Sequence, residues 1–116
     1  MKYFILLAAA PDAEPQPGTP EFDAMMEDYF SLDERMKDVA TVLSGEGLQP
    51  AETSTSVRKR NGKVETLDGP FAETREHLGG FYLIEAADLD AALAFAAEIP
   101  AARYGTVDVR PVMSYE

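Results

Sequence analysis

The chain has 116 residues, no cysteine, a single histidine and a formal net charge of −11. It is long enough to bury one core, so we expect a single domain over residues 1–116, and the lack of cysteine excludes disulfides, thiol catalysis and thiolate metal sites. One histidine also excludes a His-rich zinc site, and we expect no metal and no cofactor. The acidic balance opposes contact with a phosphate backbone, so we expect no nucleic-acid partner.

The first apolar run predicts a strand over Lys2 to Ala9, apolar on both faces as in the centre of a covered sheet. Its start is similar to a signal peptide, but a signal peptide takes roughly 15–30 residues. No run reaches the roughly 20 apolar residues of a membrane span. We therefore expect a cytoplasmic protein with no membrane partner.

A helix is predicted to begin at Thr19, a capping residue that is followed by Pro20. Apolar side chains at helical spacing continue from residue 22 to residue 43, and the glycines that follow predict the helix end. The segment Ser31–Glu34 matches a capping box, which predicts a break or kink there.

A hairpin is predicted between Glu52 and Leu67, because two β-rich runs flank Asn61-Gly62. Its first arm has one large apolar residue, Val57, which is typical of an edge strand, a protrusion or the wet wall of a pocket. The basic residues Arg58-Lys59-Arg60 and Lys63 lie near the tip, where a charge run is typical of a solvated surface.

The remaining elements are predicted to be a strand, a helix and a strand. The strand runs from Leu78 to Glu85, with Phe81 and Leu83 on one face and Tyr82 and Ile84 on the other. The helix begins after Asp88, ends at Pro100 and presents an apolar stripe of Leu89, Ala92, Leu93, Ala96 and Ile99; the last strand covers Thr106 to Met113.

The order β-α-β(hairpin)-β-α-β predicts an α+β fold, a ferredoxin-like sandwich with an extra β-hairpin and both helices on one face of an antiparallel sheet. The other face would have no cover, although the first and third strands are apolar on both faces. We therefore expect a homodimer in which sheet packs against sheet.

The run from Asp68 to Glu76, followed by Leu78-Gly79-Gly80-Phe81-Tyr82-Leu83-Ile84, resembles the DGPF group of YCII-related proteins, as do residues 45–50, 99–102 and 109–112. The group most often has lysine where this chain has Arg75. The resemblance implies a dimeric α+β barrel and, in the wider family, enzymes with a His–Asp pair in a cleft. The family histidine lies early in the chain, whereas this sequence has none before His77. DGPF proteins are also often encoded beside extracytoplasmic-function sigma factors, which implies such a partner by association only.

The candidate site residues lie in or near the same run. Asp68 either accepts a hydrogen bond from the turn backbone or acts as a general base or ligand anchor. Arg75 either binds a carboxylate or phosphate or pairs with a nearby carboxylate such as Glu73. His77 is either a packing residue or an acid–base catalyst. Phe71 is expected to plug the core beneath the turn, with a pocket wall as the alternative.

Two further residues complete the candidate set. Arg110 is two residues from Asp108 on the same strand face, so it is either paired there or a cation in the dimer cleft. Tyr82 is expected to line the same cleft, and Glu73, Arg75 and His77 share a face if the backbone is extended.

These residues support two hypotheses. The first is a small dimeric enzyme that acts on a small anionic organic molecule in a cleft between the helices and the hairpin. In it Asp68 and His77 are catalytic, and Glu73, Arg75, Tyr82 and Arg110 bind the ligand. The second is a non-catalytic dimeric binding or regulatory module that acts with a sigma factor, because the early histidine is missing and the surface is acidic.

Overall fold

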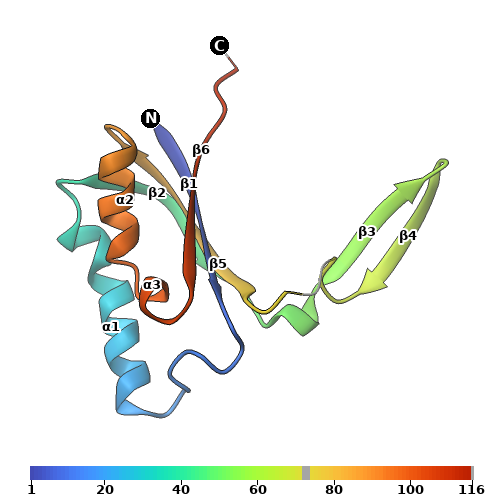
Figure 1. The fold of residues 1–116 in the computed structure, drawn as a ribbon, viewed down its shortest axis with the longest axis horizontal. Helices are drawn as coiled ribbons and strands as arrows, with labels where there is room; N and C mark the ends of the chain where they lie inside the picture. Colours follow the sequence, from blue (N-terminus) through green and yellow to red (C-terminus); the bar gives the residue numbers. More distant parts are fainter. Residues whose placement is uncertain (72–73, 116) are drawn as a thin grey trace.

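The computed structural model describes residues 1–71 and 74–115 (Figure 1). In chain order its elements are β1 (Lys2–Ala9), α1 (Pro20–Arg35), β2 (Ala40–Gly47), the short 3-10 helix η1 (Ala51–Thr53), β3 (Thr55–Arg60), β4 (Lys63–Asp68), β5 (His77–Ala86), α2 (Leu89–Ala97), α3 (Ala101–Tyr104) and β6 (Thr106–Pro111). Four strands form an antiparallel sheet in the order β2-β5-β1-β6, and β3 pairs with β4 in a separate sheet. The predicted α+β class is confirmed. The body has the order β-α-β-β-α-β, but its second strand is β2, which the sequence did not predict. Within the described residues, no helix is long and apolar enough to cross a membrane.

Helix α1 begins as predicted, because the Thr19 side chain accepts a hydrogen bond from the Phe22 amide at 3.1 Å. The predicted end of this helix is wrong. The helix stops at Arg35, and residues 40–47 form strand β2 instead. Val42 pairs with Ile84 of β5, so sheet pairing overrides the helical spacing of the apolar residues.

The predicted break within α1 is also wrong, because the helix continues through the capping-box match. The hydroxyl of Ser31 donates to the carbonyl of Asp28 instead of capping a new turn, and Arg35 donates to the same hydroxyl oxygen at 2.9 Å. A Ser side chain inside a helix commonly bonds back to the preceding turn in this way.

The hairpin is confirmed. Asn61 and Gly62 have φ values of 53° and 77°, which is the positive-φ pair that a two-residue hairpin turn requires. Strands β3 and β4 extend away from the body of the molecule, and η1 leads into them (Figure 1).

The second half of the chain follows the predicted order. Asp88 caps α2 by accepting a hydrogen bond from the Ala91 amide at 2.9 Å, as predicted. The predicted stripe is only partly right, because Leu89 and Leu93 are each 47% exposed whereas Phe95 is fully buried. The helix therefore turns a face centred on Phe95 toward the sheet.

The two faces of the four-stranded sheet differ. The helix-side face carries Tyr3 and Ile5 of β1 beside Ile84 and Tyr82 of β5, and the first three are fully buried. The other face, which we call the open face, is not covered by any helix of the described residues (Figure 1). Its apolar side chains are the half-buried Phe4, Leu6, Phe81 and Leu83, and the rings of Phe4 and Phe81 stack at 5.3 Å.

Candidate functional site

A cavity of about 900 Å³ lies between the open face and the base of the hairpin, and we call it the hairpin-base cavity. One wall comes from the open face, and the other comes from the chain on either side of the hairpin. The lining residues that matter here are Ser54, Arg75, Glu76, His77, Thr106 and Asp108. Helices α1, α2 and α3 contribute no described residue to its lining, so the predicted cleft between the helices and the hairpin is wrong.

Ser54 gives this cavity a polar group that lacks a partner. Its hydroxyl oxygen is buried and has no hydrogen-bond partner among the described residues. Its backbone is fully used, because its amide donates to Ala51 at 3.0 Å and its carbonyl accepts from Gly69 at 2.7 Å. Buried hydroxyls are normally satisfied, so this one is an exception among the described residues.

Arg75 and His77 both line the hairpin-base cavity, and their joint role in a site stays a prediction. Arg75 is exposed, and His77, the first residue of β5, is half-buried. The predicted partner Glu73 lies outside the described residues. Within those residues, Arg75 forms no ion pair with Asp68 or Glu76.

Asp68 does not line the hairpin-base cavity but a neighbouring hollow of about 620 Å³, which His77 also borders. Asp68 is the last residue of β4, is exposed and pairs with Thr55. The predicted hydrogen bond to the backbone two residues on is wrong, because that residue is Pro70, which has no N–H. The turn is held instead by Ser56, whose hydroxyl donates to the Gly69 carbonyl at 2.9 Å.

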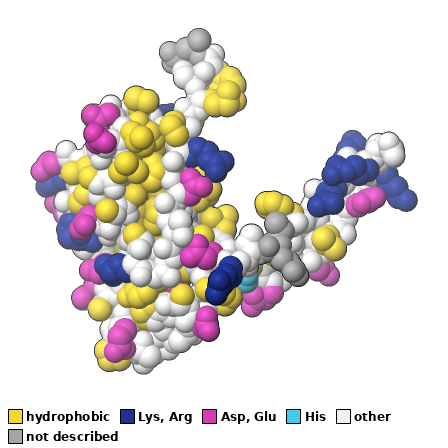
Figure 2. Space-filling view, viewed as in Figure 1, with side chains coloured by type: hydrophobic (Ala, Val, Ile, Leu, Met, Phe, Trp, Pro, Cys, Tyr) yellow, Lys and Arg dark blue, Asp and Glu magenta, His cyan; other side chains and the backbone are white. Residues whose placement is uncertain are grey.

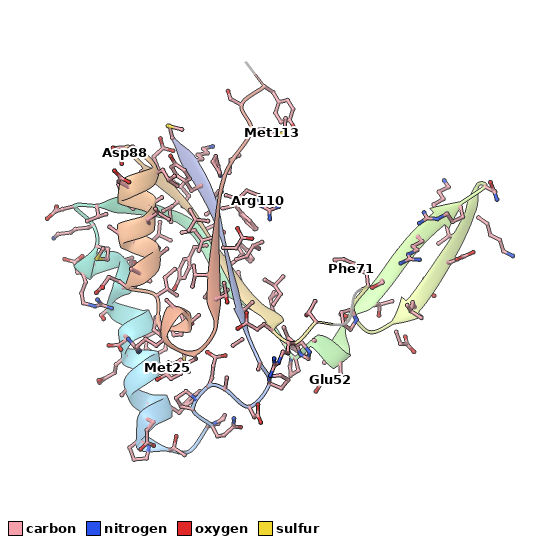
Figure 3. The ribbon with its side chains drawn as sticks, in the orientation of Figure 1. Met25, Glu52, Phe71, Asp88, Arg110 and Met113 are labelled. Atoms are coloured by element: carbon pink, nitrogen blue, oxygen red, sulfur yellow. The ribbon has the colours of Figure 1, made fainter. Side chains whose placement is uncertain are left out.

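The prediction that Phe71 plugs the core is wrong. Its side chain is 79% exposed and lies at the base of the hairpin, far from the body core (Figure 3). The alternative, a pocket wall, holds, because Phe71 lines both the hairpin-base cavity and the neighbouring hollow.

Arg110 lies on the open face, where its guanidinium donates to Asp108 at 3.2 Å. The paired alternative of the prediction is therefore observed (Figure 3). Asp108 lines the hairpin-base cavity, so Arg110 acts there by offsetting the charge of that carboxylate.

Tyr82 lies on the opposite face, so the prediction that it shares a cleft with Arg110 is wrong. The register places Tyr82 beside Ile5 on the helix-side face and Arg110 beside Phe4 on the open face. The Tyr82 ring packs edge-on against Phe95, with centroids 5.8 Å apart. Successive residues along a strand point to opposite faces of the sheet, so the register between the strands decides which face each side chain occupies.

Tyr82 lines a second cavity of about 490 Å³, between α1 and the sheet. Tyr29 and Glu14 also line it. Burial, and then the negative charge of Glu14, raise the pKa of Tyr29 to about 12. Burial, and then the charge of Asp33, raise the pKa of Tyr82. Both phenols therefore stay protonated at neutral pH and can donate hydrogen bonds within this cavity.

The sequence did not identify this second cavity. Tyr29 fits the helical stripe of α1, and such a residue is usually part of the core. The glycines Gly45 and Gly47 predict a helix end, whereas residues 45–47 belong to strand β2 and line one wall of the second cavity. A β-carbon on Gly45 would lie 2.7 Å from the Tyr82 ring, so the glycine is what leaves room for that ring. The pair of β-branched residues Thr41 and Val42 was the available signal for the strand.

No group of three or more His, Cys, Asp or Glu side chains could hold a metal ion, as far as the described residues extend. The polar side chains that line the hairpin-base cavity include the Arg75 guanidinium, the His77 imidazole and the carboxylates of Glu76 and Asp108. A guanidinium can bind oxygen-bearing anions, and an imidazole can accept and donate a proton.

Comparisons with known proteins agree with this architecture. The family model of the YCII-related domain matches residues 1–116. An uncharacterized protein of Rhizobium meliloti (strain 1021) is 35% identical over 98 residues, which cover 83% of this chain and 79% of the relative. The fold is similar to that of 5-chloro-2-hydroxyhydroquinone dehydrochlorinase (TftG) from Burkholderia phenoliruptrix AC1100, solved in complex with 2,5-dihydroxybenzoquinone. That likeness has a TM-score of 0.53 and 14% identity, and it covers 97% of this chain and 94% of the other.

Proposed function

The chain belongs to the family of YCII-related domains, and on that premise we propose that it is a small, cytoplasmic, dimeric enzyme acting on a small anionic organic molecule. The observation that carries the proposal is the buried Ser54 hydroxyl, which has no partner among the described residues and shares a cavity with Arg75 and His77. A buried donor without a partner costs about 1–3 kcal/mol, which a polar ligand would offset. The structural neighbour TftG is named for its action on a chlorinated hydroquinone, which supports a ligand of that size.

Each residue has a distinct role in the proposed site. Arg75 binds the anionic oxygens of the ligand, and Ser54 donates to a second oxygen. His77 transfers the proton, because an imidazole nitrogen can both accept and donate one. Asp68 serves as anchor or second acid–base group where a ligand extends past His77 into the neighbouring hollow. Glu73 keeps its place in the proposal as a ligand-binding residue from the adjoining segment.

The negative charge of the protein opposes the binding of an anionic ligand. The chain carries a net charge of −11, and Glu76 and Asp108 also line the cavity. Arg110 offsets Asp108 at 3.2 Å, which leaves Arg75 to attract the ligand. Binding is therefore expected to depend on Arg75 more than on any neutral group of the cavity.

A second copy of the chain would complete the molecule. Phe4, Leu6, Phe81 and Leu83 form a contiguous apolar group on the open face, and contiguous apolar surface of this kind marks an interface. Sheet-to-sheet packing of two copies, which gives a dimeric α+β barrel, would bury it symmetrically.

Calorimetric titration with benzoate and with 2,5-dihydroxybenzoquinone tests the site. Binding by the wild type should weaken about tenfold or more in Arg75→Gln, because charge-assisted hydrogen bonds are worth about 1.5–3 kcal/mol. Ser54→Ala should weaken it less, and Arg35→Gln, an exposed arginine on α1, is the matched control. Equal affinity in wild type and Arg75→Gln would contradict the site.

The binding or regulatory module is the second candidate, and one observation favours it. Asp68 does not line the cavity that Arg75 and His77 share, and the sequence has no histidine before His77. A ligand that binds through Arg75 but is recovered unchanged by mass spectrometry after long incubation would favour this candidate. A sigma factor as its partner is tested by co-purification with the full chain.

A further inference from the structure

Strands β3 and β4 form an arm, residues 55–68, that shares no sheet with any other strand of the described residues. It projects away from the body in Figure 1. Every residue of the arm except Ser56 is exposed. The radius of gyration is 16.2 Å, whereas a compact domain of this length has about 13 Å.

An arm of this kind is not a stable structure by itself. A two-stranded hairpin alone is at best marginally stable in water and needs packing against something else. The register places Val57 and Val64 on one face of the arm with Thr55 and Thr66, and these valines are 65% and 60% exposed. The same face carries Lys59 opposite Val64 and Asp68 opposite Thr55. This β-branched face is suited to packing against another surface, yet the rest of the chain does not reach it.

The other face of the arm is basic. Arg58, Arg60 and Lys63 lie on it, with Glu65 paired opposite Arg58. Residues 58–63 carry four positive charges and no negative one, so the other 110 residues carry 6 basic against 21 acidic side chains, a net charge of −15. Figure 2 shows basic side chains gathered at the arm tip, and acidic side chains together with some basic ones spread over the body. The charge of the arm tip is therefore complementary to the acidic body of a second copy of the same chain.

The position of the arm relates it to the open face. The base of the arm and the open face are the two walls of the hairpin-base cavity. A copy that packs on the open face is thus brought next to the arm, and in a two-fold dimer each arm meets the other body at the same time. The two-fold dimer then covers both the open face and the arm.

We propose that the arm of each copy lies along the acidic body of a second copy and clasps the dimer. The β-branched face packs against the partner, and the basic residues near the tip pair with carboxylates of the partner. This inference rests on the dimer of the proposed function, but it assigns the arm a separate contribution to the affinity between the copies.

Sedimentation equilibrium of charge variants tests the clasp. Arg60→Gln with Lys63→Gln removes two neighbouring charges of the arm, and Arg35→Gln with Lys37→Gln removes the same charge from the end of α1. We expect the dimer dissociation constant to rise about tenfold in the arm variant and to change less than about threefold in the control. Added salt should weaken the wild type more than the arm variant.

Each other outcome of this experiment overturns a defined part of the proposal. A wild type that stays monomeric at all concentrations overturns both the dimer and the clasp. A wild-type dimer that the arm variant matches in affinity and salt dependence overturns the clasp alone. In either case, the proposed site stands if Arg75→Gln abolishes ligand binding. Binding of duplex DNA that the arm variant loses would assign the basic residues to nucleic acid and overturn the clasp.

Photo-crosslinking locates the arm directly, because the chain has no cysteine and accepts a single label. A benzophenone maleimide on Thr66→Cys, in a mixture of isotopically light and heavy copies, should give mixed-isotope products joined to peptides of the partner body. The same label on Asp90→Cys, at the exposed start of α2, should not. Arm-to-arm products, or products within one copy, would overturn the clasp.

Discussion

The body and the arm are both built from antiparallel strands, yet they meet the requirement for burial in different ways. In the body, alternate residues of β1 are buried beneath the helices, with Tyr3 and Ile5 at 1% and 0% exposure. In the arm, β4 has no buried or half-buried residue at all. The body is folded by its core, whereas the arm is shaped locally by the Asn61-Gly62 turn. Stability therefore lies in the body, and the arm contributes surface.

The largest test of this comparison removes one apolar side chain from each region. Phe95→Ala should cost about 3–5 kcal/mol, because the ring is fully buried between α2 and the sheet. Val57→Ala should change stability by less than about 0.5 kcal/mol, because its side chain is exposed. Urea unfolding measures both, at a protein concentration where the copies are dissociated. Similar losses at the two positions would refute the division.

The next effect concerns backbone packing in the body. A β-carbon on Gly105 would overlap the carbonyl oxygen of Ala8, since the turn after α3 passes directly over β1. Gly105→Ala should therefore cost about 1–3 kcal/mol through a forced backbone shift. Gly47→Ala is the control, because a β-carbon added there would have no other atom within 4 Å. A neutral Gly105→Ala in thermal unfolding would show that the turn relaxes freely.

A pair of aspartates extends the comparison to polar groups. Asp88 caps α2 in the body, so Asp88→Ala should cost about 1 kcal/mol. Asp68 is an exposed residue at the end of the arm, so Asp68→Asn should stay within about 0.5 kcal/mol of wild type. If Asp68→Asn loses more than Asp88→Ala in urea unfolding, the turn after β4 is structural and its carboxylate is not held for a ligand.

The last effect is a dependence of stability on pH, which does not appear at neutral pH. Tyr29 has its pKa raised to about 12 by burial and by Glu14, whereas an unfolded tyrosine titrates near 10. Its contribution to stability is therefore complete below pH 10 and is lost as the pH rises from 10 through about 12. Urea midpoints between pH 9 and 12 should fall less steeply for Tyr29→Phe than for wild type. Equal slopes would mean that Tyr29 is solvated.

The sequence predicted those elements whose signals are local. The Thr19 and Asp88 caps and the Asn61-Gly62 turn each rest on chemistry within four residues, and each is confirmed. Strand β2 was missed because residues 40–43 continue the helical spacing of α1, and only pairing with β5 makes them a strand. That pairing partner lies more than forty residues away, where no local pattern can signal it.

The candidate site divides in the same way. Arg75 and His77 line one cavity in the structure, whereas their joint role in a site stays a prediction. Tyr82 and Arg110 were separated because their faces depend on the register between strands, which sequence spacing does not give. Ser54 was missed for a physical reason: a serine reveals its importance only when its hydroxyl is buried without a partner.

The exposed arm also bears on the lifetime of a chain that has no partner. Residues 58–63 place Arg58, Lys59, Arg60 and Lys63 on an uncovered tip, and exposed tips are preferred points of proteolytic cleavage. An arm clasped against a second copy would be shielded, so a trypsin-like protease should cut dilute protein faster than concentrated protein. The clasp would then couple assembly to survival, and unassembled copies would be the first to be degraded.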